Sequence, residues 1–353
     1  MGDKKNIMNN TELTKDEIEL YDRQIRLWGI SAQQRMRSSK VLLFNLGGLG
    51  TEITKNLVLS GIGHLTIVDD HDIVDEDLDT QFFLSLEDLA IGGKRVDKAK
   101  HRIQDMNPRV KIDVKYNLLE NLEKELSQYD LVILTEVNDK LDIIQINEIT
   151  HSLNIPLYVC GCHGLYGYIF VDLIKFDSKD EKLKNGNFST KLGKLSNNRE
   201  VIEVTDKIDD LDPTKIFEKI VTRNYYKTFQ QVLQTARVSD ISFTKKQMKR
   251  LTPAAPVIFA SLFDDRSQKD FLSMANICKI IKKLNLPQEY TVSKEFLDNF
   301  KNNQLNLEFS PVCAVIGGAV AQDVINILGK RESPLNNFII FDGTTLEMPI
   351  FEF

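Results

Sequence analysis

The order of hydrophobic and polar positions predicts strands that alternate with helices over the first half of the chain. Val41 to Phe44 is a short apolar run, which is typical of a parallel strand buried on both faces. Apolar residues then keep helical spacing from Leu49 to Leu57, and Gly61 supplies a left-handed stop. His64 to Val68 is predicted to be the next parallel strand. The same pattern predicts further strands at 110–116, 131–134, 156–160, 168–174 and 337–341, and helices at 94–106, 139–153 and 310–329.

Strands that alternate with helices favour a doubly wound, mostly parallel α/β sheet of the Rossmann type. The pattern changes at Lys175, because residues 176–199 are polar and aperiodic, and we predict a mobile loop there. Helices are predicted over 212–237, 271–283 and 294–301, the first of them capped by Asp212-Pro213. Residues 1–11 are predicted to be a disordered tail and 12–175 an α/β core. Residues 176–309 are predicted to form a mobile loop with a helical insertion, and 310–353 return to the core.

The helix predicted after the tail presents two different faces. Thr14 and Glu17 form a capping box that starts it, and Gly29 ends it. One face carries Ile18, Tyr21, Ile25 and Trp28, and the opposite face carries Asp22, Arg23 and Arg26. A second short helix, residues 31–37, leads into the Val41 strand. Surface arginines are commonly solvated or paired with nearby acids, so the pattern alone assigns no function to them.

Composition and charge exclude several classes of protein. The 353 residues include 45 Lys plus Arg and 51 Asp plus Glu, and the net charge of −6 argues against nucleic-acid binding as the main role. The polar amino terminus lacks the apolar core of a secretory signal, and Asn6 interrupts a myristoylation pattern. Because we find no apolar run of membrane-spanning length, we expect a soluble intracellular protein with no membrane partner.

The sequence predicts no metal site and no catalytic cysteine. Asp75, Asp77 and Asp79 alternate as in a calcium loop, but Thr80 and Leu86 replace the glycine and the glutamate that such a loop needs. None of the four cysteines forms a CxxC pair, which argues against structural zinc. No local signature marks any of them as a nucleophile.

The glycines after the Val41 strand are the strongest sign of a nucleotide site. Gly47, Gly48 and Gly50 let the backbone turn sharply and let a helix start close against the strand. Asp69 follows about twenty residues later, where dinucleotide folds place an acid that binds the ribose. An NAD-dependent dehydrogenase is therefore one hypothesis. Asn45 and the absence of a placed catalytic histidine count against it.

Two parts of the chain resemble the activating enzymes for ubiquitin-like proteins. One is Tyr-Asp-Arg-Gln-Ile-Arg-Leu-Trp-Gly at 21–29, together with the Gly-Gly-Leu-Gly loop at 47–50. The other is Cys-Ala-Val-Ile-Gly-Gly at 313–318, followed by Asn-Asn-Phe-Ile-Ile-Phe-Asp-Gly at 336–343. Within that family the chain is similar to the smaller subunits of SUMO-activating enzymes. The equivalent subunits for the cullin modifier are the alternative, but they usually carry a longer helical insertion. The resemblance implies a MoeB-like adenylation fold.

The resemblance also implies partners and cofactors. Family members adenylate the carboxyl terminus of the modifier with ATP and magnesium, then transfer it to a cysteine. Two homologous halves pack together, and only one holds a working ATP site. The implied partner is the larger catalytic subunit of a SUMO-activating enzyme, which binds ATP and Mg in an obligate heterodimer. SUMO and the conjugating enzyme would contact the complex, and a nuclear as well as cytoplasmic location is implied.

Departures from the family pattern indicate that this chain's own site binds no nucleotide. Active halves have a glycine where this chain has Asn45, and an Asn-x-Asn-Arg-Gln-Phe segment where residues 77–82 read Asp-Leu-Asp-Thr-Gln-Phe. Two aspartates without an arginine would repel a triphosphate. A lysine is replaced by Gly93, with Lys94 and Arg95 adjacent, and the magnesium-binding aspartate by Val137, with Glu136 beside it. We expect Gly47, Gly48, Gly50 and Asp69 to form a degenerate loop.

The resemblance implies a different role for the amino-terminal helix. In the family, an arginine of this helix reaches across the heterodimer to the ATP phosphates, and Arg23 matches it. Its permanent charge and planar fork suit phosphate oxygens. Arg26 is a second candidate because a residue three positions further on lies on nearly the same helix face. A pure scaffold without nucleotide contact is the remaining alternative.

Overall fold

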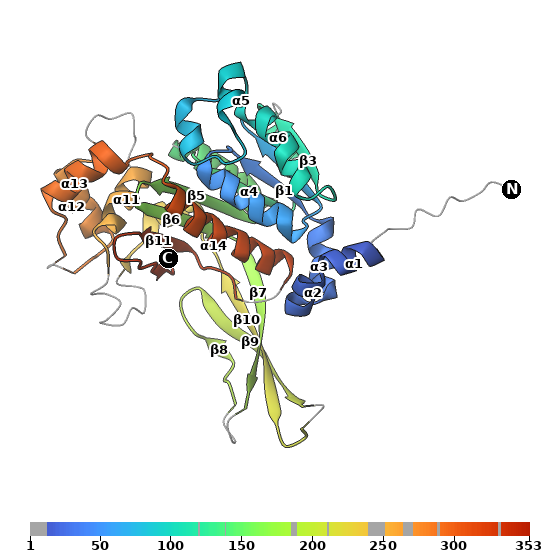
Figure 1. The fold of residues 1–353 in the computed structure, drawn as a ribbon. Helices are drawn as coiled ribbons and strands as arrows, with labels where there is room; N and C mark the ends of the chain where they lie inside the picture. The colour runs from blue at the N-terminus through green and yellow to red at the C-terminus, as the bar shows by residue number, and fades with distance from the viewer. Residues whose placement is uncertain are drawn as a thin grey trace.

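The computed structural model describes residues 13–118, 121–137, 139–184, 189–209, 212–238, 251–263, 271–287, 290–330 and 333–353. Its centre is an eight-stranded sheet with the order β12-β11-β6-β5-β4-β1-β2-β3 (Figure 1). Strands β3, β2, β1, β4 and β5 are parallel, and β6, β11 and β12 add an antiparallel edge. The bounds are β1 Lys40–Phe44, β2 His64–Val68, β3 Lys111–Lys115, β4 Leu131–Thr135, β5 Leu157–His163, β6 Tyr166–Asp172, β11 Phe338–Asp342 and β12 Ile350–Phe351.

Helices cover both faces of this sheet. On one face α4, α6 and α14 pack on side chains such as Val41 and Leu43, and on the other α8, α9 and α11 pack on side chains such as Leu42. Alternate residues of β1 therefore enter different cores, as expected of a buried parallel strand. The helices are α1 Lys15–Leu20, α2 Asp22–Trp28, α3 Ile30–Ser38, α4 Gly48–Ser60, α5 Leu86–Ile91, α6 Arg95–Met106, α7 Leu122–Leu126, α8 Lys140–Ser152, α9 Phe229–Thr235, α11 Ala254–Phe263, α12 Met274–Lys283, α13 Lys294–Asn299 and α14 Ser310–Leu328.

The long apolar helix α14 lies against α4 across the front of the sheet (Figure 1). By length and composition it could cross a membrane, so the expectation that no apolar run reaches that length was wrong. In this fold 56% of its most apolar stretch is buried, which is typical of the core helix of a soluble domain. The helices approach closely at Gly317, where a Cβ atom would lie 2.7 Å from the Cβ atom of Glu52.

A second sheet projects from the body, and here two predictions were wrong. Residues 176–199 were expected to form a loop, and 212–237 to form a helix. Instead β7 Lys175–Leu183, β10 Ile216–Tyr225, β9 Arg199–Ile208 and β8 Gly193–Lys194 form a four-stranded antiparallel sheet in that order. Asp212 and Pro213 lie in the connection between β9 and β10, so they cap no helix. Only α9 lies in the predicted helical stretch.

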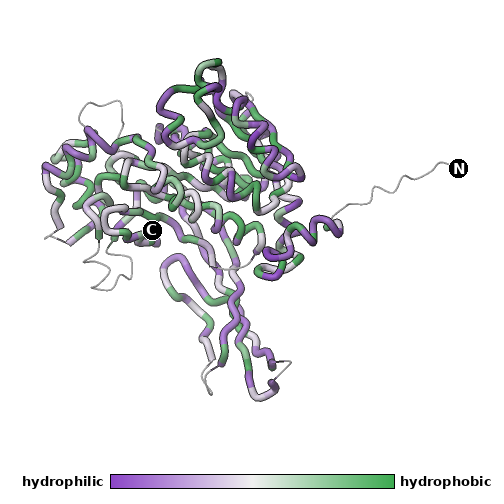
Figure 2. The backbone as a smooth tube through the Cα atoms, in the orientation of Figure 1, coloured by the Kyte–Doolittle hydropathy of each residue, from purple (hydrophilic) through white to green (hydrophobic). Residues whose placement is uncertain are grey.

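The composition of the projecting sheet explains both errors. Charged residues of neighbouring strands pair across its surface, as in the Arg223–Asp177 ion pair, whose Nε–Oδ1 distance is 2.8 Å. Such strands lack the apolar alternation of a half-buried strand, so they resemble loop sequence. In Figure 2 this sheet mixes hydrophilic and hydrophobic segments. In β10 the apolar pair Ile216 and Ile220 has helical spacing, yet the burial alternates with a period of two.

Elsewhere most predicted elements are confirmed, with small changes. The predicted amino-terminal helix divides at Tyr21 into α1 and α2. The predicted strands at 110–116, 131–134, 156–160, 168–174 and 337–341 correspond to β3, β4, β5, β6 and β11. Helix α11, an apolar segment in the second core, was not predicted.

Neighbouring glycines of α14 give a matched test of the α4–α14 contact. Gly317→Ala is expected to lower the free energy of unfolding, because the new methyl group meets Glu52 and overpacking costs about 1–3 kcal/mol. Gly318 has open space at its Cβ position, so Gly318→Ala should be neutral or stabilise by up to about 1 kcal/mol through helix propensity. Urea unfolding of the two variants measures the difference, and equal stabilities would contradict the packing.

Candidate functional site

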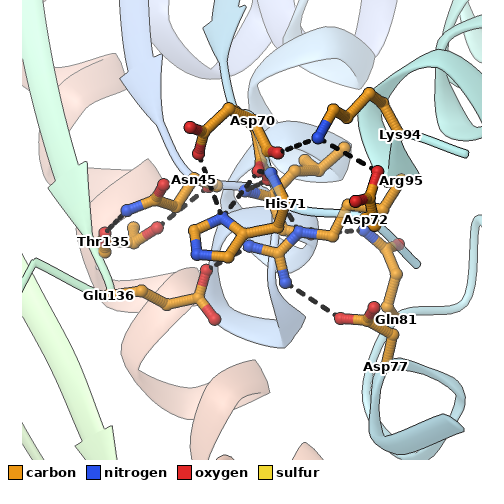
Figure 3. A network of polar contacts seen from close by, with 12 residues as sticks. Asn45, Asp70, His71, Asp72, Asp77, Gln81, Lys94, Arg95, Thr135 and Glu136 are labelled. Atoms are coloured by element: carbon orange, nitrogen blue, oxygen red, sulfur yellow. Dashed lines mark hydrogen bonds and ion pairs between the residues drawn. The ribbon is translucent and has the colours of Figure 1, made fainter. Parts of the chain in front are cut away.

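The glycine loop joins β1 to α4 at the carboxyl edge of the parallel strands. Gly50 allows a close approach, since a Cβ atom there would lie 2.3 Å from the carbonyl oxygen of Asn45. Asn45 itself takes a left-handed conformation with φ of 64°, and its Nδ2 donates to the carbonyl of Thr135 at 2.7 Å (Figure 3). Asparagine tolerates this conformation better than most residues. The loop therefore keeps a tight turn with Asn45 at this position.

A carboxylate of the same chain occupies the amides at the start of α4. The N–H of Gly48 donates to Glu308 Oε2 at 2.5 Å, and the N–H of Leu49 donates to Glu308 Oε1 at 2.8 Å. The first amides of a helix have no partner within the helix, and they attract anions. In nucleotide-binding folds such amides bind phosphate, whereas here Glu308 satisfies them. The sequence analysis missed Glu308 because no local motif surrounds it.

Arg95 lies among three carboxylates beside the loop (Figure 3). Its Nε donates to Asp69 at 2.7 Å, its Nη1 to Asp77 at 2.9 Å and its Nη2 to Glu136 at 2.6 Å. The side chain of Arg95 is 6% exposed and that of Asp69 is fully buried. The sequence left open whether this arginine reaches the site. It does, from α6, but all three of its nitrogen atoms are engaged by protein carboxylates.

Asp69 is also held by the loop itself. Its carboxylate accepts the N–H of Leu46 at 2.7 Å and the N–H of His71 at 2.9 Å. Burial alone would raise the pKa of Asp69, but Arg95 and these amides outweigh it and keep the pKa below its usual value. Asp69, the acid that would bind a ribose in a dinucleotide fold, is thus engaged by Arg95 and by backbone amides of its own chain.

The surroundings of the loop are strongly acidic. Glu308 adds a fourth carboxylate near Arg95 and Glu136. Burial raises the pKa of Glu308, and the nearby charge of Glu136 raises it further, against the opposing amides of the loop. A cavity of about 480 Å³ opens at the switch point between β1 and β4, and its lining includes Glu136, Asp139 and Asp142.

These groups do not fit ATP with magnesium. A triphosphate would have to displace Glu308 from Gly48 and Leu49 and would then face excess negative charge. Val137 lines the cavity beside Glu136, and its side chain cannot coordinate a cation. Asp69, Asp70 and His71 have ligand atoms within 4.8 Å of one another, but Asp69 is already paired with Arg95.

The two arginines of the amino-terminal segment lie far from this loop. Arg23 and Arg26 are both exposed on α2. Gln24 of the same helix donates to the carbonyl of Leu59, which places α2 at the carboxyl end of α4, whereas the glycine loop is at the other end. A helix of 13 residues is about 20 Å long. Arg23 therefore does not contact the glycine loop of its own chain.

The two arginines differ in their contacts. Arg26 pairs with Asp22, with an Nη2–Oδ2 distance of 3.0 Å. Within the described part of the chain, the side chain of Arg23 makes no hydrogen bond or ion pair. Arg23 is thus exposed at the surface without an ion-pair partner among the described residues.

Three of the cysteines are buried together. The Sγ atoms of Cys162 on β5 and Cys313 on α14 are 3.8 Å apart, and Cys160 is buried beside them. Burial raises the pKa of Cys160, and the contact with Cys313 together with burial raises that of Cys162. Thiols held in this neutral form are poor nucleophiles. Cys278 is exposed on α12.

Sequence and structure comparisons place the chain in a family. Residues 21–353 match the ThiF family, and the chain belongs to that family, which has an adenylation-type fold. It is 49% identical to the DNA damage tolerance protein RHC31 of Saccharomyces cerevisiae over 352 residues, which cover 98% of this chain and 99% of the relative. It is 34% identical to the DNA damage tolerance protein rad31 of Schizosaccharomyces pombe, with coverage of 98% and 99%.

The same comparisons include SUMO-activating enzyme subunit 1 of Homo sapiens, which is 32% identical to this chain over 94% of the chain and 93% of the relative. Among solved structures, selenomethionine PaaA covers 100% of this chain and 79% of its own, with a TM-score of 0.55 and 17% identity. The match to E. coli MccB with succinimide covers 94% of this chain and 70% of the MccB chain, with a TM-score of 0.51 and 14% identity. These two likenesses show the fold alone, and they confirm the expected MoeB-like architecture.

Replacing the buried arginine tests the electrostatics of the site. Arg95→Met is expected to destabilise the protein by about 3–5 kcal/mol at pH 7, because it leaves buried carboxylates without a cation. The lowered pKa of Asp69 gives stability that is present above the ordinary carboxylate pKa and is lost as pH falls through the folded-state pKa. The difference between variant and wild type should therefore shrink as pH falls below the ordinary Asp pKa of 3.8.

Lys94→Met is the matched control for this measurement. Lys94 makes a more exposed ion pair with Asp72 at 3.0 Å, so its loss should change the free energy of unfolding by at most about 1 kcal/mol. Denaturant unfolding across pH measures both variants. Equal effects of the two substitutions, or an Arg95→Met effect that does not depend on pH, would contradict the account of the site.

Proposed function

We propose that this chain is the non-catalytic subunit of a heterodimeric SUMO-activating enzyme. The larger subunit would bind ATP and magnesium, adenylate the carboxyl terminus of SUMO and form the thioester on its own cysteine. The likeness to the human SUMO-activating enzyme subunit 1 over nearly the whole chain supports this choice. The observation that carries the proposal is the combination of a glycine loop bound to Glu308 with an exposed Arg23 at the far end of α4, which has no ion-pair partner among the described residues.

In this proposal Arg23 acts in trans. Its guanidinium would contact the phosphates of ATP on the larger subunit and stabilise the charge that develops as the adenylate forms. Arginine suits this role because it stays charged at any physiological pH and can bind two oxygens at once. Within the described chain no acid neutralises Arg23, so its charge is available to a partner. Arg26, already paired with Asp22, is the weaker candidate.

The surface around Arg23 suits a protein partner. Leu20, Leu27 and Ile30 are 55%, 69% and 44% exposed on α1, α2 and α3. Large exposed apolar side chains on the same segment as an exposed charge are typical of a protein–protein interface. An interface here would bury these groups and bring Arg23 to the other subunit.

The alternatives have less support. The equivalent subunit for the cullin modifier would use the same geometry, and the relatives named above favour SUMO. A dehydrogenase would need Asp69 for the ribose, but its carboxylate is bound to Arg95 and to the loop amides. A pure scaffold without nucleotide contact differs from our proposal only in the role of Arg23.

Arg23→Ala in the reconstituted heterodimer tests that role. We expect ATP–pyrophosphate exchange to slow by about 10²–10³-fold, the usual effect of removing one transition-state donor. Arg26→Ala, on the same helix, is expected to have a much smaller effect because Arg26 is already paired. Thermal unfolding and dimer assembly are the controls. An unchanged exchange rate in Arg23→Ala would leave the pure scaffold as the better explanation.

Calorimetric titration of the isolated chain with ATP and magnesium tests the degenerate site. We expect no saturable heat at millimolar nucleotide, because Glu308 and the acids around Arg95 oppose the phosphates. The heterodimer provides the positive control, with one binding event per dimer. A stoichiometric signal from the isolated chain would refute the degenerate-site hypothesis.

A further inference from the structure

The segment that carries Arg23 is attached to the carboxyl end of α4. The last carbonyl groups of a helix have no partner within the helix and need other donors. Three side chains supply them, with N–O distances of 2.9, 3.3 and 2.8 Å: Asn107 to Val58, Gln24 to Leu59 and Gln33 to Ser60. Gln24 and Gln33 belong to the amino-terminal segment, so the cap of α4 and the attachment of that segment are the same contacts.

Tyr21 fixes the beginning of α2. Its ring is 4% exposed, and its hydroxyl accepts a hydrogen bond from Asn107 Nδ2 at 2.8 Å. A Cβ atom on Gly61 would lie 2.5 Å from the ring of Tyr21, so only glycine allows this contact. Asn107 is itself buried, and its Nδ2 also donates to the carbonyl of Val58. One amide group thus joins the end of α4 to the residue before α2.

Gln33 fixes the other end of α2. It is fully buried, its Oε1 accepts the indole N–H of Trp28 at 3.0 Å, and its Nε2 donates to the carbonyl of Ser60. Trp28 is the last residue of α2, and Tyr21 immediately precedes the first. The helix is therefore held at both ends, while Arg23 between them stays exposed.

We propose that Asn107, Tyr21 and Gln33 are positioning residues for Arg23, and this inference rests on the proposed function in trans. An arginine on a loose segment would have to be ordered at the moment of reaction, which weakens its contribution. Anchors at both ends of α2 order the backbone during folding. A catalytic group displaced by about 1 Å can lose about 10²-fold in rate, so the anchors affect adenylation although none of them contacts the nucleotide.

A purely structural role for the same residues makes a different prediction. If the anchors act through Arg23, their removal should cost little more once Arg23 is absent, because groups that act as a unit are not additive. If they act through general stability, the losses should multiply. Combining each anchor variant with Arg23→Ala separates the two roles.

The test uses Tyr21→Phe, Gln33→Leu and their combinations with Arg23→Ala in the full heterodimer. We expect each single anchor variant to slow ATP–pyrophosphate exchange by roughly 10-fold through kcat, with little change in KM for ATP. In the Arg23→Ala background the further loss should be less than about twofold. Tyr226→Phe is the matched control, since it also removes a buried tyrosine hydroxyl, which donates to the carbonyl of Leu335 at 2.9 Å. It should leave exchange unchanged.

Hydrogen exchange of the isolated chain provides a readout independent of catalysis. The amides of residues 22–28 are expected to exchange faster in Tyr21→Phe and Gln33→Leu, and not in Tyr226→Phe. Unchanged protection there, an unchanged kcat, or full multiplication of the losses with Arg23→Ala would overturn the positioning role. A normal rate in Arg23→Ala alone would instead refute the proposed function, while the protection data would still show whether the anchors hold α2.

Discussion

The fold around the glycine loop depends on two amides at the start of α4 that bind the carboxylate of Glu308. A helix that begins at a glycine loop presents unpaired N–H groups, and these require an anion or a polar group. In this chain the segment before α14 provides it. The loop amides therefore have partners within the chain, and the acids around Arg95 would repel a polyphosphate.

Helix α4 runs from the glycine loop to the segment that carries the exposed Arg23. Its first turn is held by Glu308, and its last carbonyls by Gln24, Gln33 and Asn107. In the middle it packs against α14 through the close approach at Gly317. The glycine loop thus has a structural use that does not involve nucleotide, since it starts a helix whose other end supports Arg23.

The parts that sequence could predict are those with local signals. The apolar runs of β1 and β4 and the periodicity of α6 and α8 define the α/β core, because buried strands and amphipathic helices differ in period. The glycine loop and the motif at 21–29 are local as well. Glu308 could not be found this way, because its partners lie about 260 residues away in the chain. The ion pairs of Arg95 could not be predicted for the same reason, because their partners are distant in the sequence. From the sequence, Arg95 could be identified only as a cation near Gly93.

The projecting sheet shows a second limit. Strand pairing there depends on cross-strand contacts such as Arg223–Asp177, which can be recognised only once the register is known. The residues that anchor α2 could be predicted only in part, because some of their signals are local and others depend on distant residues. The helical pattern placed Tyr21 on the apolar face of the predicted helix, but its hydrogen bond to Asn107 depends on a residue at the end of α6.

The central claim is that this chain contributes Arg23 to another subunit's site and binds no ATP itself. The most direct test is a structure of the heterodimer with a non-hydrolysable ATP analogue and magnesium. The account predicts nucleotide on the larger subunit, with the guanidinium of Arg23 at hydrogen-bond distance from its phosphates and Glu308 still on Gly48 and Leu49. Nucleotide bound to Gly48 and Leu49 with Glu308 displaced, or Arg23 far from any phosphate, would contradict it.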